Sequence, residues 1–109
     1  MALELKSRVI FSTVVIDMSG RLCFLETGLR GLVRALLEEG HRDFVLNLSD
    51  LEYIDSFGLG QMVSVWTSIH NRGGQMKLLQ PGERVLKLLE LTKLTSVFEI
   101  ATHDDTVLQ

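Results

Sequence analysis

The chain has few of the features that mark a secreted or membrane-spanning protein. Its single cysteine, Cys23, excludes an internal disulfide, and a chain without disulfides suits a reducing compartment. No apolar run reaches the roughly 20 residues that a membrane span requires. The first residues also lack a basic segment followed by a long apolar one, so no signal peptide is predicted. We therefore expect a cytoplasmic protein that does not itself insert into a membrane.

Positive charge and aromatic side chains are also scarce. The 11 Lys and Arg residues are outnumbered by 14 Asp and Glu residues, the formal net charge is -3, and the basic residues are scattered. A nucleic-acid-binding surface would cluster them, so no nucleic acid is expected as a partner. Aromatic residues make up 6% of the 109 residues and hydrophobic residues 46%. This composition predicts a single domain, residues 1–109, with a mostly aliphatic core.

The motifs of common catalytic and metal sites are missing as well. His41, His70 and His103 have no His or Cys partner at ligand spacing, so no metal site is predicted. The chain has no Gly-x-x-x-x-Gly-Lys-Ser/Thr loop of the kind that binds phosphates. A serine hydrolase carries its nucleophile in a Gly-x-Ser-x-Gly motif. Here Ile54 stands two residues before Ser56, in the place of the first glycine, and no well-placed histidine follows. We therefore expect no enzymatic activity and no cofactor.

The spacing of apolar residues predicts strands and helices in a regular order. Strands are predicted at 3–8, 14–18, 44–48, 76–79 and 97–100, and helices at 27–39, at 57–71 and from Pro81 onward. Ser19-Gly20 and Ser49-Asp50 are expected to end the strands before them, and Asp104 and Asp105 to cap a final helical turn. The order predicts an α/β domain with a mixed sheet, in which an N-terminal hairpin joins parallel βαβ units covered by helices.

The segment from Asp55 to Gly60, Asp-Ser-Phe-Gly-Leu-Gly, lies where a strand pattern gives way to a helix pattern. Asp and Ser are preferred at helix starts, because their short side-chain oxygens accept from free backbone N–H groups. The partial positive charge of a helix start also tolerates a phosphate on Ser56. From this pattern alone Ser56 is either a cap or a phosphoacceptor. Gly58 and Gly60 permit the close approach either of a partner or of the preceding loop.

Four motifs follow one another along the chain: Leu46-Asn47-Leu48, Tyr53-Ile54-Asp55-Ser56, Gly58-Leu59-Gly60 and Gly73-Gly74. With them the sequence resembles the STAS family, and within it the bacterial anti-sigma factor antagonists, from about Leu3 to Ile100. The resemblance implies a mixed sheet covered by helices. It also implies a protein that binds a kinase-type anti-sigma factor when unphosphorylated and so releases a sigma factor. The kinase, which brings its own ATP and Mg²⁺, would then phosphorylate Ser56 and end the interaction, and a phosphatase would restore it.

The resemblance also indicates which residues meet the partner. They are expected at the start of the second helix and in the loop after Gly20: Asp55, Phe57, Gly58, Leu59, Gly60, Arg21, Cys23 and Phe24. Asp55 is predicted either to orient the Ser56 hydroxyl as well as cap the helix, or only to cap it. Phe57, where the family commonly has Ser or Thr, either folds inward as a staple, which we favour, or contacts the partner.

The loop after Gly20 departs from the family pattern. Cys23 replaces the usual aspartate, and Phe24 and Leu25 make the loop more apolar. We favour a small buried side chain for Cys23 over a reactive thiol. An apolar loop suits a constitutive interface, so the alternative function is that of a non-phosphorylated STAS subunit of a membrane transport complex.

Overall fold

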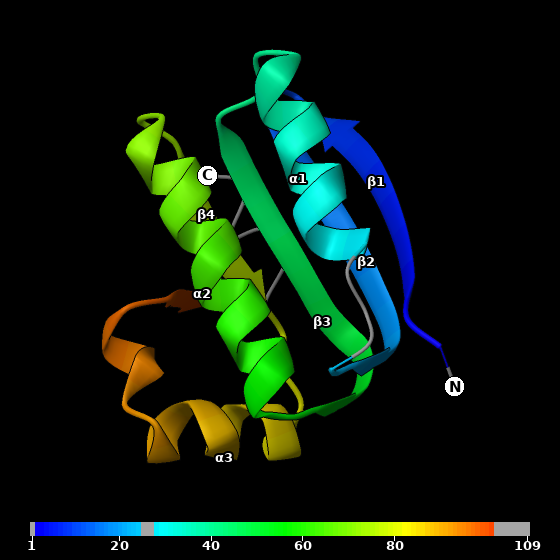
Figure 1. Cartoon of the computed structure of the whole chain (residues 1–109), viewed down its shortest axis with the longest axis vertical. Helices are drawn as coiled ribbons and strands as arrows, with labels where there is room; N and C mark the ends of the chain where they lie inside the picture. The colour runs from blue at the N-terminus through cyan, green and yellow to red at the C-terminus, as the bar shows by residue number, and fades with distance from the viewer. Residues whose placement is uncertain (1, 25–27, 102–109) are drawn as a thin grey trace.

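The computed structural model describes residues 2–24 and 28–101 (Figure 1). Over these residues the chain forms a five-stranded sheet and three α-helices, which confirms the predicted α/β class. Several predictions lie outside the described residues: the helix start at Thr27, the place of Leu25 in the loop, His103, and the cap at Asp104 and Asp105. No helix in the described part of the chain is long and apolar enough to cross a membrane.

The elements follow the predicted order. They are β1 (Glu4–Ile10), β2 (Thr13–Leu22), α1 (Gly28–Glu38), β3 (Asp43–Ile54), α2 (Ser56–Asn71), β4 (Gln75–Leu79), α3 (Glu83–Leu91), the 3-10 helix η1 (Leu94–Ser96) and β5 (Glu99–Ala101). The strands lie side by side in chain order, with β1 antiparallel to β2 and each later pair parallel. The predicted N-terminal hairpin and parallel units are therefore confirmed.

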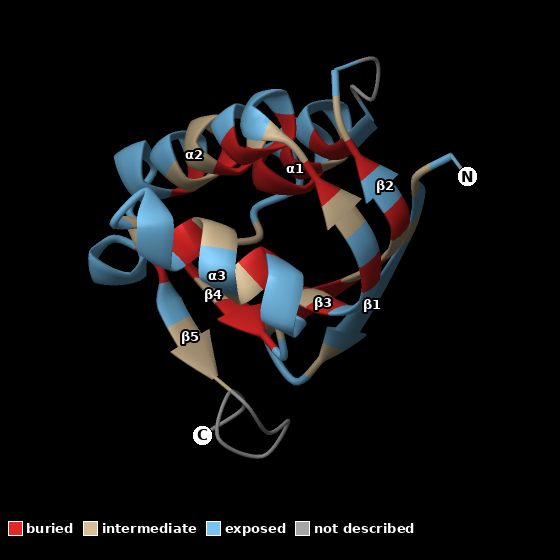
Figure 2. Ribbon diagram, turned by 90° about the horizontal axis from the view of Figure 1, so that it is seen from below, coloured by how far each residue is buried: buried red, intermediate tan, exposed pale blue. Residues whose placement is uncertain are grey.

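Helices α1 and α2 lie next to each other across one face of the sheet, and α3 lies at one end of it, near the start of α2 (Figure 1). The buried residues lie on the parts of the helices that face the sheet and along the sheet itself (Figure 2). They are almost all aliphatic, and Phe44 and Phe98 are the buried aromatic residues within the described part of the chain. Burial of these apolar surfaces is what holds the helices on the sheet.

Two strands run through the turns that were predicted to end them. β2 continues beyond Gly20 to Leu22, and β3 continues beyond Asp50 to Ile54 without a turn, so both predicted ends are wrong. The two extensions pair with each other, with Leu22 opposite Ile54. This long-range pairing outweighs the low strand preference of Ser, Gly and Asp. A register shift between Gly20 and Arg21 and a φ of 89° at Gly20 accommodate the irregular stretch.

Two later boundaries also differ from the prediction. α3 begins at Glu83 rather than at Pro81, because Gly82 is the N-cap and keeps an extended backbone. The last strand is Glu99–Ala101, because Val97 still belongs to the turn that closes η1. Neither change alters the topology. The end of β2, the end of β3 and the start of α2 meet at the end of the sheet where α3 lies (Figure 1).

Candidate partner-binding site

The first turn of α2 presents Ser56 directly after β3. Asp55 is the N-cap of the helix, with an extended backbone and with its Oδ1 accepting a hydrogen bond from the Gly58 N–H at 2.8 Å. Ser56 is therefore the first helical residue rather than the cap, and it is exposed. The carboxylate contact of Asp55 is with Gly58 rather than with the Ser56 hydroxyl, which supports the capping role alone. The free N–H groups of the first turn make this a favourable place for an added anion.

Gly58 lets β2 pass against the first turn of α2. A Cβ atom on Gly58 would overlap the Leu22 carbonyl oxygen and lie 2.8 Å from the Leu22 carbonyl carbon. Of the two interpretations considered for this glycine, the structure therefore supports close approach of the preceding chain. Gly58 and Leu59 are both buried, so they hold α2 in place and do not offer a surface to a partner. Gly60 is exposed, and its missing side chain would meet open space.

The chain that follows β2 lies beside the start of α2, as the resemblance implied. Gln61 donates from its Nε2 to the Cys23 carbonyl oxygen at 3.2 Å. The rings of Phe24 and Phe57 meet edge to face, with centroids 4.9 Å apart and an interplanar angle of 64°. The structure thus brings the 21–24 segment and the first turn of α2 together at one site.

Phe57 does not fold inward. Its side chain is 59% exposed and that of Phe24 is 63% exposed, so the favoured interpretation of Phe57 as an inward staple is wrong. Since successive helical residues are about 100° apart, burial of Gly58 and Leu59 turns Phe57 toward solvent. We call Phe24 and Phe57 the aromatic pair. Exposed rings of this kind are enriched where interfaces carry most of their binding energy.

Arg21 and Cys23 have different surroundings. The Arg21 guanidinium lies 4.3 Å from the centroid of the Tyr53 ring, a cation–π contact that keeps a positive charge at this end of the sheet. Cys23 is a free, half-buried cysteine, so the expectation of a buried side chain holds only in part. Contact of either residue with a partner stays a prediction.

Sequence reasoning missed Gln61. Its Oε1 is buried and has no hydrogen-bond partner in the structure, while its Nε2 holds the Cys23 carbonyl. The sequence did offer one signal, because Gln61 is a polar amide directly before Met62 in a part of the helix that is otherwise apolar. An unsatisfied buried oxygen is costly unless water or a partner donates to it. Gln61 therefore links the helix to the segment that carries Phe24.

A second surface feature, a groove, lies between the end of β3 and α3. This groove of about 770 Å³ separates Tyr53 and Ile54 from α3, where Leu86 and Leu91 contribute apolar lining. Leu91 is 72% exposed, although it sits at the end of a helix packed on the core. In the described part of the chain, no group of three His, Cys, Asp or Glu side chains is placed to hold a metal ion. This end of the sheet thus brings together the Ser56 hydroxyl, exposed apolar side chains and the Arg21 guanidinium.

This arrangement can be compared with known proteins. The sequence matches the family model described as "STAS domain" over residues 4–107. The chain belongs to the STAS domain family. It is 42% identical over 64 residues to a putative anti-sigma factor antagonist of Thermotoga maritima. That match covers 59% of this chain and 57% of the Thermotoga protein, so the chain spans little more than half of that relative.

Two further matches cover more of the chain. The anti-sigma-B factor antagonist of Bacillus subtilis is 32% identical over 77 residues, which are 71% of this chain and 70% of that protein. The crystal structure of a putative anti-sigma factor antagonist from Thermotoga maritima superposes with a TM-score of 0.84 at 27% identity. It covers 95% of this chain and 91% of that one. The mixed sheet with its covering helices is therefore the STAS fold.

Proposed function

We propose that the protein is an anti-sigma factor antagonist that binds a kinase-type anti-sigma factor and is switched off by phosphorylation of Ser56. The observation that carries this proposal is the exposed Ser56 hydroxyl at the first position of α2, with the aromatic pair exposed beside it. The relatives named as anti-sigma factor antagonists support the general role. Binding of the unphosphorylated protein would release a sigma factor, and a phosphatase would reverse the switch.

In this function Ser56 is a substrate and not a nucleophile of the protein's own. The neighbouring carboxylate of Asp55 is occupied by the Gly58 N–H, and the other side chains that meet here are aromatic rings and an amide. The partner kinase supplies the base and holds ATP with Mg²⁺. The γ-phosphoryl group passes from ATP to the Ser56 oxygen, and the hydroxyl proton goes to the base of the kinase. ADP remains in the active site of the kinase after the transfer. The protein itself acts as a binding module.

The structure of the site gives the switch its physical basis. A phosphate on Ser56 adds about -1.5 to -2 charge and three strong acceptor oxygens. The first turn of α2 tolerates this charge, because its N–H groups and dipole favour an anion. A partner packed on the aromatic pair would have to desolvate the same charge against apolar rings, which is costly. A loss of about 3 kcal/mol in binding corresponds to more than a hundredfold weaker affinity.

Phosphorylation with purified components tests the proposal. The protein is incubated with its cognate anti-sigma kinase, ATP and Mg²⁺, and phosphate is located by intact mass and peptide mapping. We expect one phosphate on Ser56 and none in Ser56→Ala. Ser68→Ala, which removes an exposed hydroxyl further along the same helix, is the matched control and should be modified like the wild type. Phosphate that persists at full level in Ser56→Ala would contradict the proposal.

The exposed aromatic pair also favours a second candidate function, that of a constitutive interaction subunit of a membrane transport complex. Such a subunit needs its apolar contact and no phosphate. Ser56→Asp separates the two functions, since it mimics the added charge. Capture of a transporter component by wild type and Ser56→Asp alike would favour the transport function, and loss of an anti-sigma kinase from Ser56→Asp would favour the switch.

A further inference from the structure

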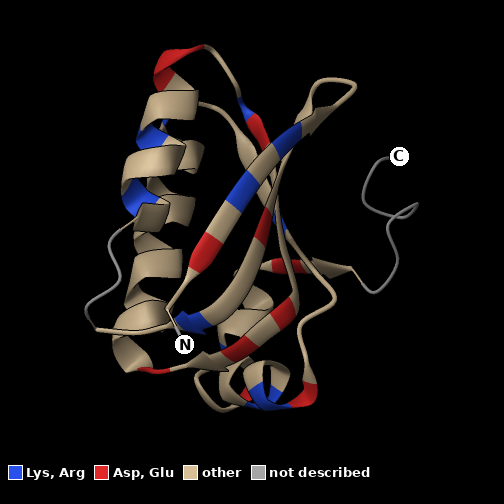
Figure 3. Ribbon diagram, turned by 90° about the vertical axis from the view of Figure 1, so that its right-hand side faces the viewer, with Lys and Arg blue, Asp and Glu red and all other residues tan. Residues whose placement is uncertain are grey.

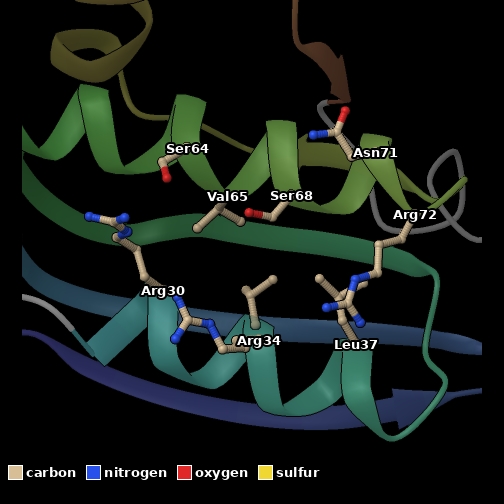
Figure 4. Close-up of a pocket in the computed structure, with 9 residues that line it drawn as sticks. Arg30, Arg34, Leu37, Ser64, Val65, Ser68, Asn71 and Arg72 are labelled. Carbon is tan, nitrogen blue, oxygen red and sulfur yellow. The ribbon is translucent and has the colours of Figure 1, made fainter.

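A separate groove runs between α1 and α2, on the helical face of the domain. It encloses about 250 Å³. Arg30 and Arg34 line it from α1, Ser64 and Ser68 from α2, and Arg72 from the residue that ends α2 (Figure 4). Ser64 is eight residues beyond Ser56, so the groove begins about 12 Å along the helix from the site described above. It is therefore a second site and not an extension of the first.

The three arginines have no acidic partner in the described part of the chain. The ion pairs found there join Arg8 to Asp17 and Lys77 to Glu99, both outside the groove. The protein as a whole is acidic, with a formal net charge of -3, yet three of its 11 basic residues line this one groove. Along α1 the basic residues precede the acidic end of the helix (Figure 3). The result is a local positive site on a negatively charged protein.

This placement of charge costs the free protein stability. Arg30 lies in the first turn of α1, where the helix dipole disfavours a cation, and that turn contains no acidic residue to offset it. Arg30 and Arg34 are four residues apart on one helix, a spacing at which like charges repel. A bound anion would remove both penalties. Neither penalty is needed to pack α1, whose contacts with the core are made by Leu29, Val33, Leu36 and Leu37.

We propose that this groove binds a small oligophosphate anion. Guanidinium groups pair with phosphate oxygens through parallel hydrogen bonds. Arg30 and Arg34 extend toward the same end of the groove and Arg72 lies at its other end (Figure 4), so the two arginines of α1 would hold the diphosphate and Arg72 would add positive charge along the groove. The hydroxyls of Ser64 and Ser68 add donors from the opposite wall. The volume of about 250 Å³ is many times the roughly 10–15 Å³ that a cavity needs to hold one water, so two linked phosphate groups have room. The ligand would bridge α1 and α2.

Calorimetric titration of the full chain with inorganic pyrophosphate tests the proposal. We expect saturable binding to the wild type in low salt, and binding at least tenfold weaker in the double variant Arg30→Gln and Arg34→Gln. Arg84→Gln removes an exposed arginine from α3 and is the matched control, which should bind like the wild type. In the same titration followed by NMR, the largest changes of amide chemical shift should fall in residues 30–37 and 64–72 and not in the first turn of α2.

Each outcome has a defined meaning. Absence of binding to the wild type at about 1 mM pyrophosphate would overturn the proposal, since that concentration detects even weak sites. Equal binding by the double variant would place the anion elsewhere and also overturn it. Equal affinity for citrate, a carboxylate anion of comparable charge, would overturn the assignment to phosphate. The double variant without ligand should unfold at a Tm no lower than that of the wild type, which would show that a loss of binding is not a loss of fold.

Discussion

The close contact between α2 and the end of β2 leads to a quantitative prediction for Gly58→Ala. The added methyl group would overlap the Leu22 carbonyl oxygen, lie 2.8 Å from the Leu22 carbonyl carbon and lie 3.0 Å from Ile54 Cγ1. Two of these three atoms belong to the backbone of a strand that is hydrogen-bonded to β3, so they cannot shift alone. We therefore expect a cost at the upper end of the range for overpacking, about 3 kcal/mol.

Helix propensity offsets part of this cost. Replacing Gly by Ala within a helix contributes up to about 1 kcal/mol, so the net destabilisation by Gly58→Ala is about 2 kcal/mol. For a domain of this size each kcal/mol lowers Tm by about 4–8 °C, which predicts a fall of about 8–16 °C. Gly60→Ala is the matched control, because nothing lies within 4 Å of its added methyl group. It gains helix propensity without a clash, and its Tm should rise by up to about 4–8 °C.

Thermal unfolding followed by circular dichroism measures both variants under one set of conditions. Opposite shifts of Tm are the expected result. If Gly58→Ala were as stable as Gly60→Ala, α2 would not be pressed against β2, and the account of how Ser56 is positioned would fail. Because the clash would displace the first turn that carries Ser56, Gly58→Ala should in addition weaken binding of the proposed anti-sigma partner.

Three further predictions have defined outcomes. Asp55→Ala removes the cap of α2 and should cost about 1 kcal/mol in urea unfolding, whereas Ser56→Ala should stay within about 0.5 kcal/mol of the wild type. Asp17→Asn tests the pH dependence of stability. Burial raises the pKa of Asp17, but hydrogen bonds from Arg8 and Asn47 and the charges of Arg8 and Lys6 lower it more. The pKa of Asp17 in the folded protein therefore lies below the ordinary 3.8. The stability from this carboxylate is therefore present above pH 3.8 and lost as pH falls through the folded-state pKa, so urea unfolding from pH 7 to pH 3 should show a smaller loss in Asp17→Asn than in the wild type. Phe57→Ser should weaken partner binding at least tenfold in calorimetry while the free energy of unfolding stays within about 0.5 kcal/mol, because the exposed ring contributes to an interface and not to the core.

Local signals in the sequence were sufficient for the order of elements and for the cap of α2. The periodicity of the helices and the Asp-Ser pair at the junction act over a few residues, so they can be read without the fold. The strand ends could not be read in this way. Ser49-Asp50 looks like a turn locally, yet it lies in β3 because the end of β2 pairs with it across a long stretch of chain. Propensity is weak against such pairing.

The site shows the same division. That Gly58 contacts Leu22, that Gln61 holds Cys23, and that Phe57 faces solvent all depend on how distant segments meet. The nearness of the 21–24 segment to Ser56 was expected only because of the resemblance to the STAS family. The arginines of the α1–α2 groove look scattered in the sequence, since Arg72 is far from Arg30, and only the packing of the helices gathers them.

The most direct measurement is the affinity of the anti-sigma partner for two forms of the same preparation, one unphosphorylated and one fully phosphorylated by the kinase. Calorimetric titration should give a dissociation constant at least tenfold higher for the phosphorylated form, equivalent to about 1.4 kcal/mol or more. Phosphate at the start of α2 would then eject the partner without unfolding the domain, and the circular dichroism spectra of the two forms should coincide. Equal affinities for a protein shown to carry phosphate on Ser56 would contradict the account.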